Sequence, residues 1–305
     1  MKFELTILGS SSATPIFNRN PTSQVLNINE RLYMIDCAEG TQQQMLRFDV
    51  KGSRIDHIFI SHLHGDHYLG LVGLLSSMHL NGRIKPLYLY GPPHLKEIID
   101  LQLTYSDTTL QYTMEFKPTN PEKGEVILDN HDVTVETVPL FHGIACTGFV
   151  FREKKRLRKL LKEKLERLKI PVEYYSALKK GADYVAADGI TLKNDTLTVD
   201  SDNPKSYAYC SDTMYNEAYF KQISNVTLLY HEATFLNNML ERAVDTQHTT
   251  ALQAAEVALK TGAEKLLIGH FSARYKTLNE LLDEARSIFP ETDLAIEGKM
   301  FVIGE

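Results

Sequence analysis

Three histidines and an aspartate fall within six positions of this chain, in the run His62-Leu63-His64-Gly65-Asp66-His67. The run directly follows the apolar residues Ile58-Phe59-Ile60, which are typical of a β-strand. If a strand ends there and a helix begins at Asp66, the first two histidines lie on one side of the connecting loop. The last two polar residues then lie on the first helical turn, so the loop can give two ligands to each of two metal ions. Imidazole nitrogen and carboxylate oxygen together favour borderline divalent ions, above all zinc.

Three further candidate ligands each follow a predicted strand within a few residues. They are His142, Asp212 and His270, which come after the predicted strands at 135–140, 207–209 and 266–268. Each adjoins a small residue that permits a tight turn. For any one of them alone, a loop side chain bonded to the backbone is an equally good explanation. Together with the first run, they could complete two sites of about four ligands each, with one carboxylate shared.

The H-x-H-x-D-H run resembles the signature of the metallo-β-lactamase superfamily. The resemblance implies a mixed α/β (α+β) fold, the αββα sandwich, in which two β-sheets pack face to face between outer helices. It also implies a two-metal site at one edge of the sheets. The ligand sets that it implies are His62, His64 and His142 for one ion, Asp66, His67 and His270 for the other, and Asp212 as the bridge.

Four other stretches are similar to loops of the ribonuclease Z family within that superfamily. They are residues 36–42 (D-C-A-E-G-T-Q, with Ala38 in place of a glycine), residues 231–234 (H-E-A-T), residues 248–250 (H-T-T for H-S-T) and residues 15–20 (P-I-F-N-R-N for P-x-K-x-R-N, with Phe17 where lysine is usual). The family implies a zinc-dependent endoribonuclease with two zinc ions per subunit and a homodimeric assembly. Its reaction would be cleavage of the phosphodiester that joins precursor transfer RNA to its 3′ trailer, leaving a 3′-hydroxyl on the transfer RNA. RNA contacts are then expected from Arg19, Asn20, Glu39 and Thr41.

Cleavage of RNA needs a nucleophile, neutralisation of charge on the phosphate and a proton for the leaving oxygen. Two zinc ions would acidify a water towards pKa ~7 and neutralise the phosphate, and Asp66 would orient that water as a general base does. The leaving 3′ oxygen has a high pKa, so it needs a proton donor that is not itself a ligand. His248 fits this role, with Glu232 holding its other nitrogen and favouring the protonated form. The simpler alternative for His248 is a capping or packing role beside Thr249.

One segment departs from the acidic character of the chain. Residues 152–169 contain ten basic and three acidic side chains, a net charge of +7, so the rest of the chain carries −13 of the total of −6. Leucines at spacings of three and four predict an amphipathic helix that ends before Pro171, and Lys179-Lys180 follow. A solvated surface helix is the simplest explanation, but a one-sided charge on an acidic body favours binding of a polyanion.

The ribonuclease Z resemblance places an inserted flexible arm at this point, which would grip the elbow of transfer RNA. The chain is then expected to be a single domain, 1–305, with an inserted arm at 152–195. RNA contacts are expected from the basic residues Lys154, Lys155, Arg158, Lys159, Lys162, Lys179 and Lys180. Family arms have a tip rich in glycine and proline, whereas residues 170–175 contain one proline and no glycine.

Composition sets the broader limits. The chain has 305 residues, 43% of them hydrophobic and 24% charged, which is typical of a globular protein with a sizeable core. The first residues alternate like a strand rather than a signal peptide, and no apolar run approaches the roughly 20 residues that span a bilayer. The three cysteines lie far apart and indicate no disulfide framework. We therefore expect a cytoplasmic protein without a membrane partner.

Two other classes of protein share some of these features. A small-molecule phosphodiesterase or arylsulfatase-like hydrolase would keep the two-metal chemistry, but it would not need a basic arm. An RNA-binding protein with a structural zinc site would have four ligands and no separate His/Glu pair. The seven candidate ligands together with His248 and Glu232 argue against a purely structural site.

Overall fold

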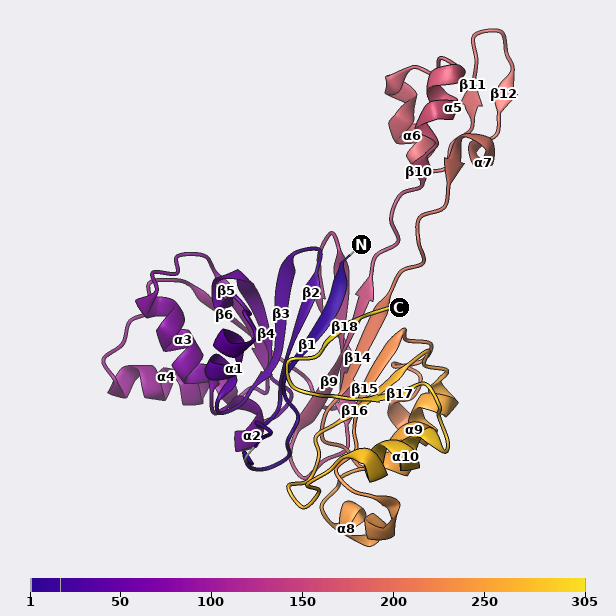
Figure 1. Cartoon of the computed structure of the whole chain (residues 1–305). Helices are drawn as coiled ribbons and strands as arrows, with labels where there is room; N and C mark the ends of the chain where they lie inside the picture. Colours follow the sequence, from indigo (N-terminus) through magenta and orange to yellow (C-terminus); the bar gives the residue numbers. More distant parts are fainter. Residues whose placement is uncertain (1, 17, 305) are drawn as a thin grey trace. The chain divides into compact units, whose positions relative to one another are not determined.

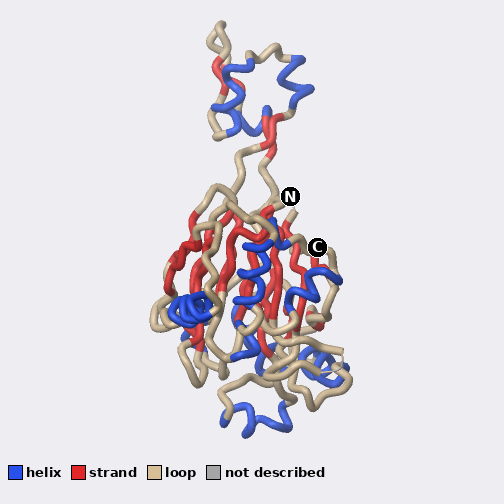
Figure 2. Tube along the Cα trace, turned by 90° about the vertical axis from the view of Figure 1, so that its left-hand side faces the viewer, coloured by secondary structure: helices blue, strands red, loops and turns tan. Residues whose placement is uncertain are grey.

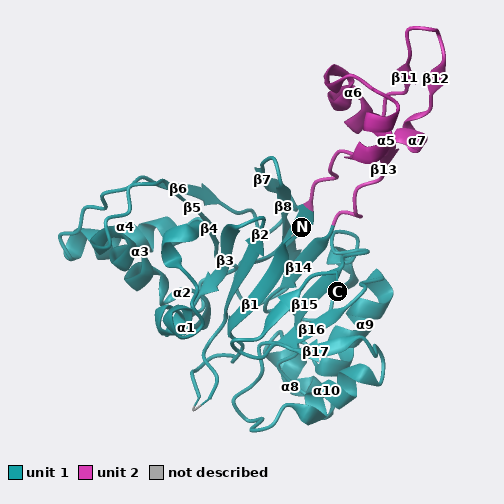
Figure 3. Cartoon of the chain, turned by 45° about the horizontal axis from the view of Figure 1, so that its top comes forward, with its two compact units in different colours: residues 1–152, 205–305 teal, residues 153–204 magenta. Residues whose placement is uncertain are grey.

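The structure is a computed structural model that describes residues 2–16 and 18–304, so Phe17 lies outside the described residues. The chain divides into two compact units (Figure 3). Residues 1–152 and 205–305 form unit 1, and residues 153–204 form unit 2. None of the helices within the described ranges is long and apolar enough to cross a membrane.

Unit 1 contains two seven-stranded sheets (Figure 2). The first sheet has the order β18-β1-β2-β3-β4-β5-β6, and it is antiparallel from β18 to β3 and parallel from β3 to β6. Its strands are β1 (Phe3–Gly9), β2 (Ser23–Ile28), β3 (Arg31–Cys37), β4 (Ile55–Phe59), β5 (Leu87–Gly91), β6 (Met114–Pro118) and β18 (Met300–Val302).

The second sheet has the order β17-β16-β15-β14-β9-β8-β7, in which β14 to β17 are parallel. Its strands are β7 (Val126–Asp129), β8 (Val133–Leu140), β9 (Cys146–Glu153), β14 (Ser206–Cys210), β15 (Leu228–Glu232), β16 (Leu266–Gly269) and β17 (Thr292–Leu294). The strands expected before the candidate ligands, at 58–60, 135–140, 207–209 and 266–268, overlap β4, β8, β14 and β16, while β6, β7 and β17 were not anticipated.

Helices cover the outer face of each sheet (Figure 1). Helices α1 (Thr41–Arg47), α3 (Leu71–Leu80) and α4 (Leu95–Tyr105) pack on the first sheet, and α9 (Ala251–Thr261) and α10 (Asn279–Arg286) pack on the second. A third core of buried side chains, including Phe59, Phe149 and Tyr209, fills the space between the sheets. The predicted αββα sandwich is therefore confirmed.

Local sequence explains where the helices begin and end. Thr250 caps α9 by accepting a hydrogen bond from the backbone N–H of Gln253, and Gly262 ends the helix in a left-handed conformation with φ of 67°. The helix expected to begin at Asp66 begins at Gly65 as α2 (Gly65–Tyr68) and is interrupted before α3. There Gly70 packs so closely against the backbone of Ala38 that an added Cβ would be 2.0 Å from the carbonyl oxygen of that residue. The glycine thus seats the start of α3 against the loop that follows β3.

Unit 2 has a small core of its own, formed by Leu165, Ile170, Leu178 and Leu197. Around it lie two short strand pairs and three short helices, namely β10 (Lys159–Leu160), α5 (Lys162–Arg167), α6 (Tyr175–Lys179), β11 (Tyr184–Val185), β12 (Thr191–Leu192), α7 (Asn194–Leu197) and β13 (Thr198–Val199). The arm expected at 152–195 falls almost wholly within this unit, which continues to Pro204.

The long basic helix predicted for residues 152–169 is wrong. Only Lys162–Arg167 are helical, because the chain before them pairs with a strand far along the sequence: Lys159 lies opposite Val199 in the β10–β13 ladder. Ten cations on a continuous helix would also repel one another, whereas this arrangement brings several of them to carboxylates. Unit 2 as a whole contains twelve basic and nine acidic residues, a net charge of +3.

Candidate metal centre

The candidate ligands meet at one edge of unit 1. Strands β4, β8, β14 and β16 end at this edge, and the ligands follow them in the loops and in α2. The carboxyl ends of parallel strands are the usual place for such a site, because several loops converge there. Residues as far apart in the sequence as His62 and His270 are thereby brought together.

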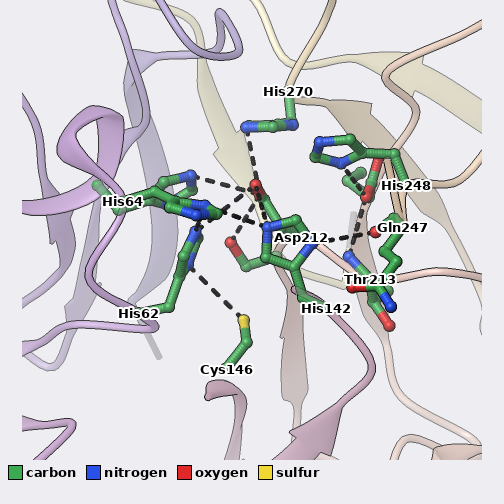
Figure 4. Close-up of polar contacts among 12 residues, drawn as sticks. His62, His64, His142, Cys146, Asp212, Thr213, Gln247, His248 and His270 are labelled. Carbon is green, nitrogen blue, oxygen red and sulfur yellow. Dashed lines mark hydrogen bonds and ion pairs between the residues drawn. The ribbon is translucent and has the colours of Figure 1, made fainter. Parts of the chain in front are cut away.

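Three imidazole nitrogens and one carboxylate oxygen form the first ligand set (Figure 4). Nδ1 of His64 lies 3.2 Å from Nε2 of His62 and 3.1 Å from Nε2 of His142. The fourth member is Oδ2 of Asp212, at 3.6 Å from Nε2 of His62 and 3.7 Å from Nε2 of His142. The four atoms thus surround one point.

The second ligand set uses the other oxygen of the same aspartate. Oδ1 of Asp212 lies 3.3 Å from Nε2 of His67 and 3.2 Å from Nε2 of His270. Oδ2 of Asp66 lies 3.6 Å from Nε2 of His67 and 3.4 Å from Nε2 of His270. Asp212, which is only 2% exposed, therefore gives one oxygen to each set.

These separations fit metal coordination. Ligand atoms about 2.0–2.1 Å from a tetrahedral ion lie about 3.3–3.4 Å from one another, close to the distances found within both sets. Nε2 of His67 is buried and has no hydrogen-bond partner among the described residues, as expected of a nitrogen that faces a cation. The residues present therefore fit a pair of metal ions.

The charge of the site also calls for cations. Burial opposes ionisation of Asp212, yet the neighbouring imidazoles of His270 and His67 hold its pKa well below the usual range. Burial lowers the pKa of His62 well below its ordinary value, which leaves the imidazole neutral with a free lone pair. At His62 the site therefore offers a neutral imidazole beside an ionised carboxylate, as a metal ion requires. At His67 the carboxylates of Asp212 and Asp36 outweigh burial and raise the pKa above its ordinary value.

Outer partners fix four of these histidines by their second ring nitrogen. Such contacts set the tautomer and orientation of a ligand. The pairs are His67 with Oδ2 of Asp36 at 2.7 Å, His270 with Oγ1 of Thr234 at 2.9 Å, His142 with the carbonyl oxygen of Gln247 at 3.1 Å, and His62 with Oγ of Ser61 at 3.0 Å. Sequence reasoning gave Asp36 and Thr234 no role, although both stand in the loops that resemble the family.

His248 and Glu232 form a separate pair beside the ligands. Nδ1 of His248 lies 2.8 Å from Oε1 of Glu232, which is fully buried. Burial alone would lower the pKa of His248, but the Glu232 carboxylate outweighs it and raises the pKa to about 9. A ligand atom of His248 also lies within 4.8 Å of those of Asp212 and His270. The pair therefore holds a protonated imidazole next to the two ligand sets.

The centre opens into a pocket of about 500 Å³. Besides His248 and five of the candidate ligands, it is lined by Ser12, Ala13, Pro15, Pro21, Glu39, Gly65, Leu69 and Thr246. The backbone N–H of Ala13 donates to Oδ2 of Asp66 at 2.7 Å, which joins the loop after β1 to the second ligand set. The volume is sufficient for a phosphodiester with one of its neighbouring nucleotides.

The four residues expected to contact RNA near the pocket occupy different settings. Glu39 is exposed and lines the pocket, whereas Thr41 is buried at the start of α1. Arg19 is only 7% exposed and donates to the carbonyl oxygens of Ser272 and Tyr275. The side-chain amide of Asn20 donates to a carboxylate oxygen of Glu297 at 2.9 Å. Arg19 and Asn20 thus stabilise loops of unit 1, and their contact with RNA stays a prediction.

The basic residues expected to bind RNA in the arm also divide into two groups. Arg158 forms ion pairs with Asp195 and Asp200, and Lys159 forms one with Asp202. The side chains of Lys155, Lys162, Lys179 and Lys180 are exposed, and no ion pair joins them to another described residue; Lys154 is half-buried. The exposed group is therefore the one that is available to an external anion.

The chain is similar to curated proteins named ribonuclease Z. The chain is 46% identical to a ribonuclease Z of Bacteroides fragilis over 296 residues, 97% of each chain. It is 48% identical to a ribonuclease Z of Cytophaga hutchinsonii over 306 residues, which covers 100% of this chain and 97% of the relative. The family model described as Anti-Pycsar protein Apyc1 matches residues 3–157, about half of the chain.

Solved structures share the fold. Human tRNase Z, short form, superposes with a TM-score of 0.71 at 24% identity and covers 99% of this chain and 100% of its own. The metallo-beta-lactamase fold protein YhfI from Bacillus subtilis superposes with a TM-score of 0.69 at 16% identity and covers 98% of each chain. With curated relatives above 40% identity along nearly its full length, and with the fold and site described above, the chain belongs to the ribonuclease Z family of enzymes.

Proposed function

We propose that this protein is a zinc-dependent endoribonuclease that removes the 3′ trailer of precursor transfer RNA and leaves a 3′-hydroxyl on the transfer RNA. The observation that carries the proposal is the position of Asp212 between two ligand sets, with the His248–Glu232 pair beside them. Two ligand sets with a shared carboxylate suit hydrolysis of a phosphodiester. The names of the relatives, ribonuclease Z and tRNase Z, support RNA as the substrate.

The ligand sets would hold two zinc ions per subunit, one on His62, His64, His142 and Asp212, the other on Asp66, His67, His270 and Asp212. When bound, the ions would lower the pKa of water towards about 7 and neutralise charge on the phosphate. Asp66 would accept a hydrogen bond from the attacking water and so orient it. Its own orientation is set by the N–H of Ala13.

His248 would protonate the leaving 3′ oxygen. Glu232 holds Nδ1, so Nε2 is the atom left to donate to the substrate. The Glu232 carboxylate raises the pKa of His248 and so favours the protonated imidazole that a proton donor to a poor leaving group needs. Glu232 cannot rotate away, because the N–H of Thr213 and the hydroxyl of Thr234 hold its two oxygens.

Unit 2 would recognise the RNA away from the cut. Its exposed lysines, Lys155, Lys162, Lys179 and Lys180, offer positive charge that no carboxylate of the arm neutralises. Arg158 and Lys159 would act instead by fixing the fold of the arm through their ion pairs. A precursor transfer RNA as the substrate implies a cytoplasmic setting.

The enzyme would act as a homodimer. Leu46, Leu80 and Ile84 are 85%, 80% and 81% exposed, and Leu46 and Ile84 line a groove of about 930 Å³ beside α1 and α3. Large apolar side chains gathered at one groove favour association with another surface. A second copy of the chain would cover this face.

The decisive experiment maps cleavage of a precursor transfer RNA that carries a 3′ trailer. We expect a single cut at the 3′ side of the mature body, a product with a 3′-hydroxyl, and loss of cleavage with a zinc chelator. A protein that hydrolyses aryl or cyclic-nucleotide phosphodiesters but leaves the precursor intact would be a small-molecule phosphodiesterase instead.

A further inference from the structure

The two carboxylate oxygens of Glu232 serve different neighbours. Oε1 accepts hydrogen bonds from Nδ1 of His248 at 2.8 Å and from the N–H of Thr213 at 2.9 Å. Oε2 accepts from the hydroxyl of Thr234 at 2.6 Å. Oγ1 of Thr234 in turn lies 2.9 Å from Nδ1 of His270. A continuous chain of hydrogen bonds therefore runs from His248 to a candidate metal ligand.

The direction of each bond follows from the donors available. The Thr234 hydroxyl has one proton, and the ionised carboxylate at 2.6 Å is a stronger acceptor than the carbonyl oxygen of His270 at 3.0 Å. The hydroxyl oxygen then offers its lone pairs to His270, so Nδ1 of His270 carries the hydrogen. Its Nε2 is left with a free lone pair that faces Asp66 and Asp212. The hydroxyl thus selects the tautomer that binds metal.

A direct version of the same arrangement exists at His67. There Oδ2 of Asp36 accepts from Nδ1 without an intervening group. At His270 the carboxylate acts through a hydroxyl, and this leaves the second oxygen of Glu232 free to hold His248. Glu232, Thr234 and His270 are each at most 2% exposed, so water does not compete for these bonds.

We propose that Thr234 is a positioning residue that lets one buried carboxylate orient two groups. Glu232 holds His248 by a direct hydrogen bond, and it orients the metal ligand His270 through the hydroxyl of Thr234. The inference rests on the proposed metal-dependent function. It assigns different roles to three side chains. Thr234 supports metal binding, His248 supports proton transfer, and Glu232 supports both.

The test measures metal affinity by competition with a chelator, using purified full-length protein and zinc. Thr234→Val keeps the shape of the side chain but removes the hydroxyl, and we expect zinc affinity at one of the two sites to fall by about 10–100 fold. Thr234→Ser restores the hydroxyl and should restore the affinity. Thr261→Val is the matched control, since Thr261 is also buried and its hydroxyl bonds only to helix carbonyls, nearest that of Val257 at 2.8 Å.

A double-mutant cycle makes the link to Glu232 testable. Glu232→Gln should weaken zinc binding. Adding Thr234→Val to this variant should lower zinc affinity much less than it does in the wild-type protein, because the chain of hydrogen bonds is already interrupted. Fully additive effects, wild-type affinity in Thr234→Val, or failure of Thr234→Ser to rescue would each overturn the proposal. A wild-type protein that binds no zinc would instead contradict the proposed function, so the two failures are distinguishable.

Discussion

The Asp36 carboxylate accepts a hydrogen bond from Nδ1 of His67 at 2.7 Å, and both side chains are fully buried. Asp36 also accepts from the hydroxyls of Ser61 and Tyr209, at 2.9 and 2.6 Å, and its backbone adopts a left-handed conformation with φ of 53°. One carboxylate thus ties β3, the loop after β4 and β14 together beneath the metal centre. It orients His67 and would strengthen this imidazole as a metal ligand.

Asp36→Asn should therefore impair metal binding without touching a ligand. The side-chain NH2 of the asparagine would be a hydrogen-bond donor placed against groups that themselves donate. We therefore expect a loss of roughly 1–3 kcal/mol in the free energy of unfolding and about 10–100 fold in zinc affinity. Thermal unfolding and chelator competition measure the two effects. Tyr209→Phe is the matched control, because it removes one bond to Asp36 but leaves His67 in place; equal losses of zinc affinity in both variants would contradict the orienting role.

Asp212→Ala should have a broader effect, since it removes an oxygen from each ligand set. We expect at least one ion to be lost and hydrolysis of every substrate to be abolished. Elemental analysis of the purified variant, with assays on precursor transfer RNA and on an aryl phosphodiester, measures this. Two bound ions with activity near wild type would show that Asp212 is not the bridge.

His248→Ala should keep the metal and the affinity for RNA but slow the chemical step by roughly 10²–10⁴ fold. A substrate with a good leaving group, such as an activated aryl phosphodiester, should lose much less, because it does not need the proton. His94→Ala, a change at an exposed histidine at the start of α4, serves as the control. Equal losses on the two substrates would remove the support for a proton donor.

The arm should account for much of the salt dependence of RNA binding. Replacing Lys155, Lys162, Lys179 and Lys180 by glutamine should weaken binding and flatten the slope of log affinity against log salt by about 3, since each phosphate contact contributes about 0.7–0.9. Hydrolysis of a small aryl phosphodiester should persist. The control changes Arg158 and Lys159, which are already paired with aspartates, and should lower the stability of the arm while leaving the salt slope nearly unchanged.

The groove beside α1 should carry the dimer contact. Leu46→Glu with Ile84→Glu places two charges on exposed apolar positions, so we expect a monomer by light scattering and an unchanged melting temperature at low protein concentration. Tyr105→Glu on α4, at a residue that is 84% exposed, should leave the assembly intact. A dimer that survives the double change would place the interface elsewhere.

The meeting of the candidate ligands at one edge could be predicted from sequence, because each follows a strand that is recognisable by itself. His62 and His64 follow the run before position 61, and Asp212 and His270 follow similar runs, so topology alone brings them to one edge. The outer partners could not be predicted in this way. Asp36 lies 31 positions from His67, and Thr234 lies 36 positions from His270, and no local pattern links the members of either pair.

In the arm, by contrast, a local pattern led to a wrong prediction of secondary structure. Leucines at helical spacing in residues 157–168 predicted one long helix, but Leu165 enters a core with Leu178 and Leu197, and Leu160 pairs with Thr198 across β10–β13. The acidic residues of positions 183–202 supply the counter-charges that keep the basic segment folded back. These partners come later in the chain, so a window limited to the basic segment omits them.

The arm is inserted between two paired strands, and this affects how the sequence of the protein can vary. Arg152 and Ser206 lie opposite each other in the antiparallel ladder of β9 and β14, so the whole of unit 2 is, in connectivity, the loop of a hairpin. Lengthening such a loop costs only about 0.6 kcal/mol for each doubling, and the ladder keeps β14 in register whatever the loop contains. Asp212, six positions after Ser206, therefore stays in place while the arm lengthens, shrinks or changes its charges. The proposed RNA-binding arm and the proposed metal centre can thus evolve at different rates within one chain.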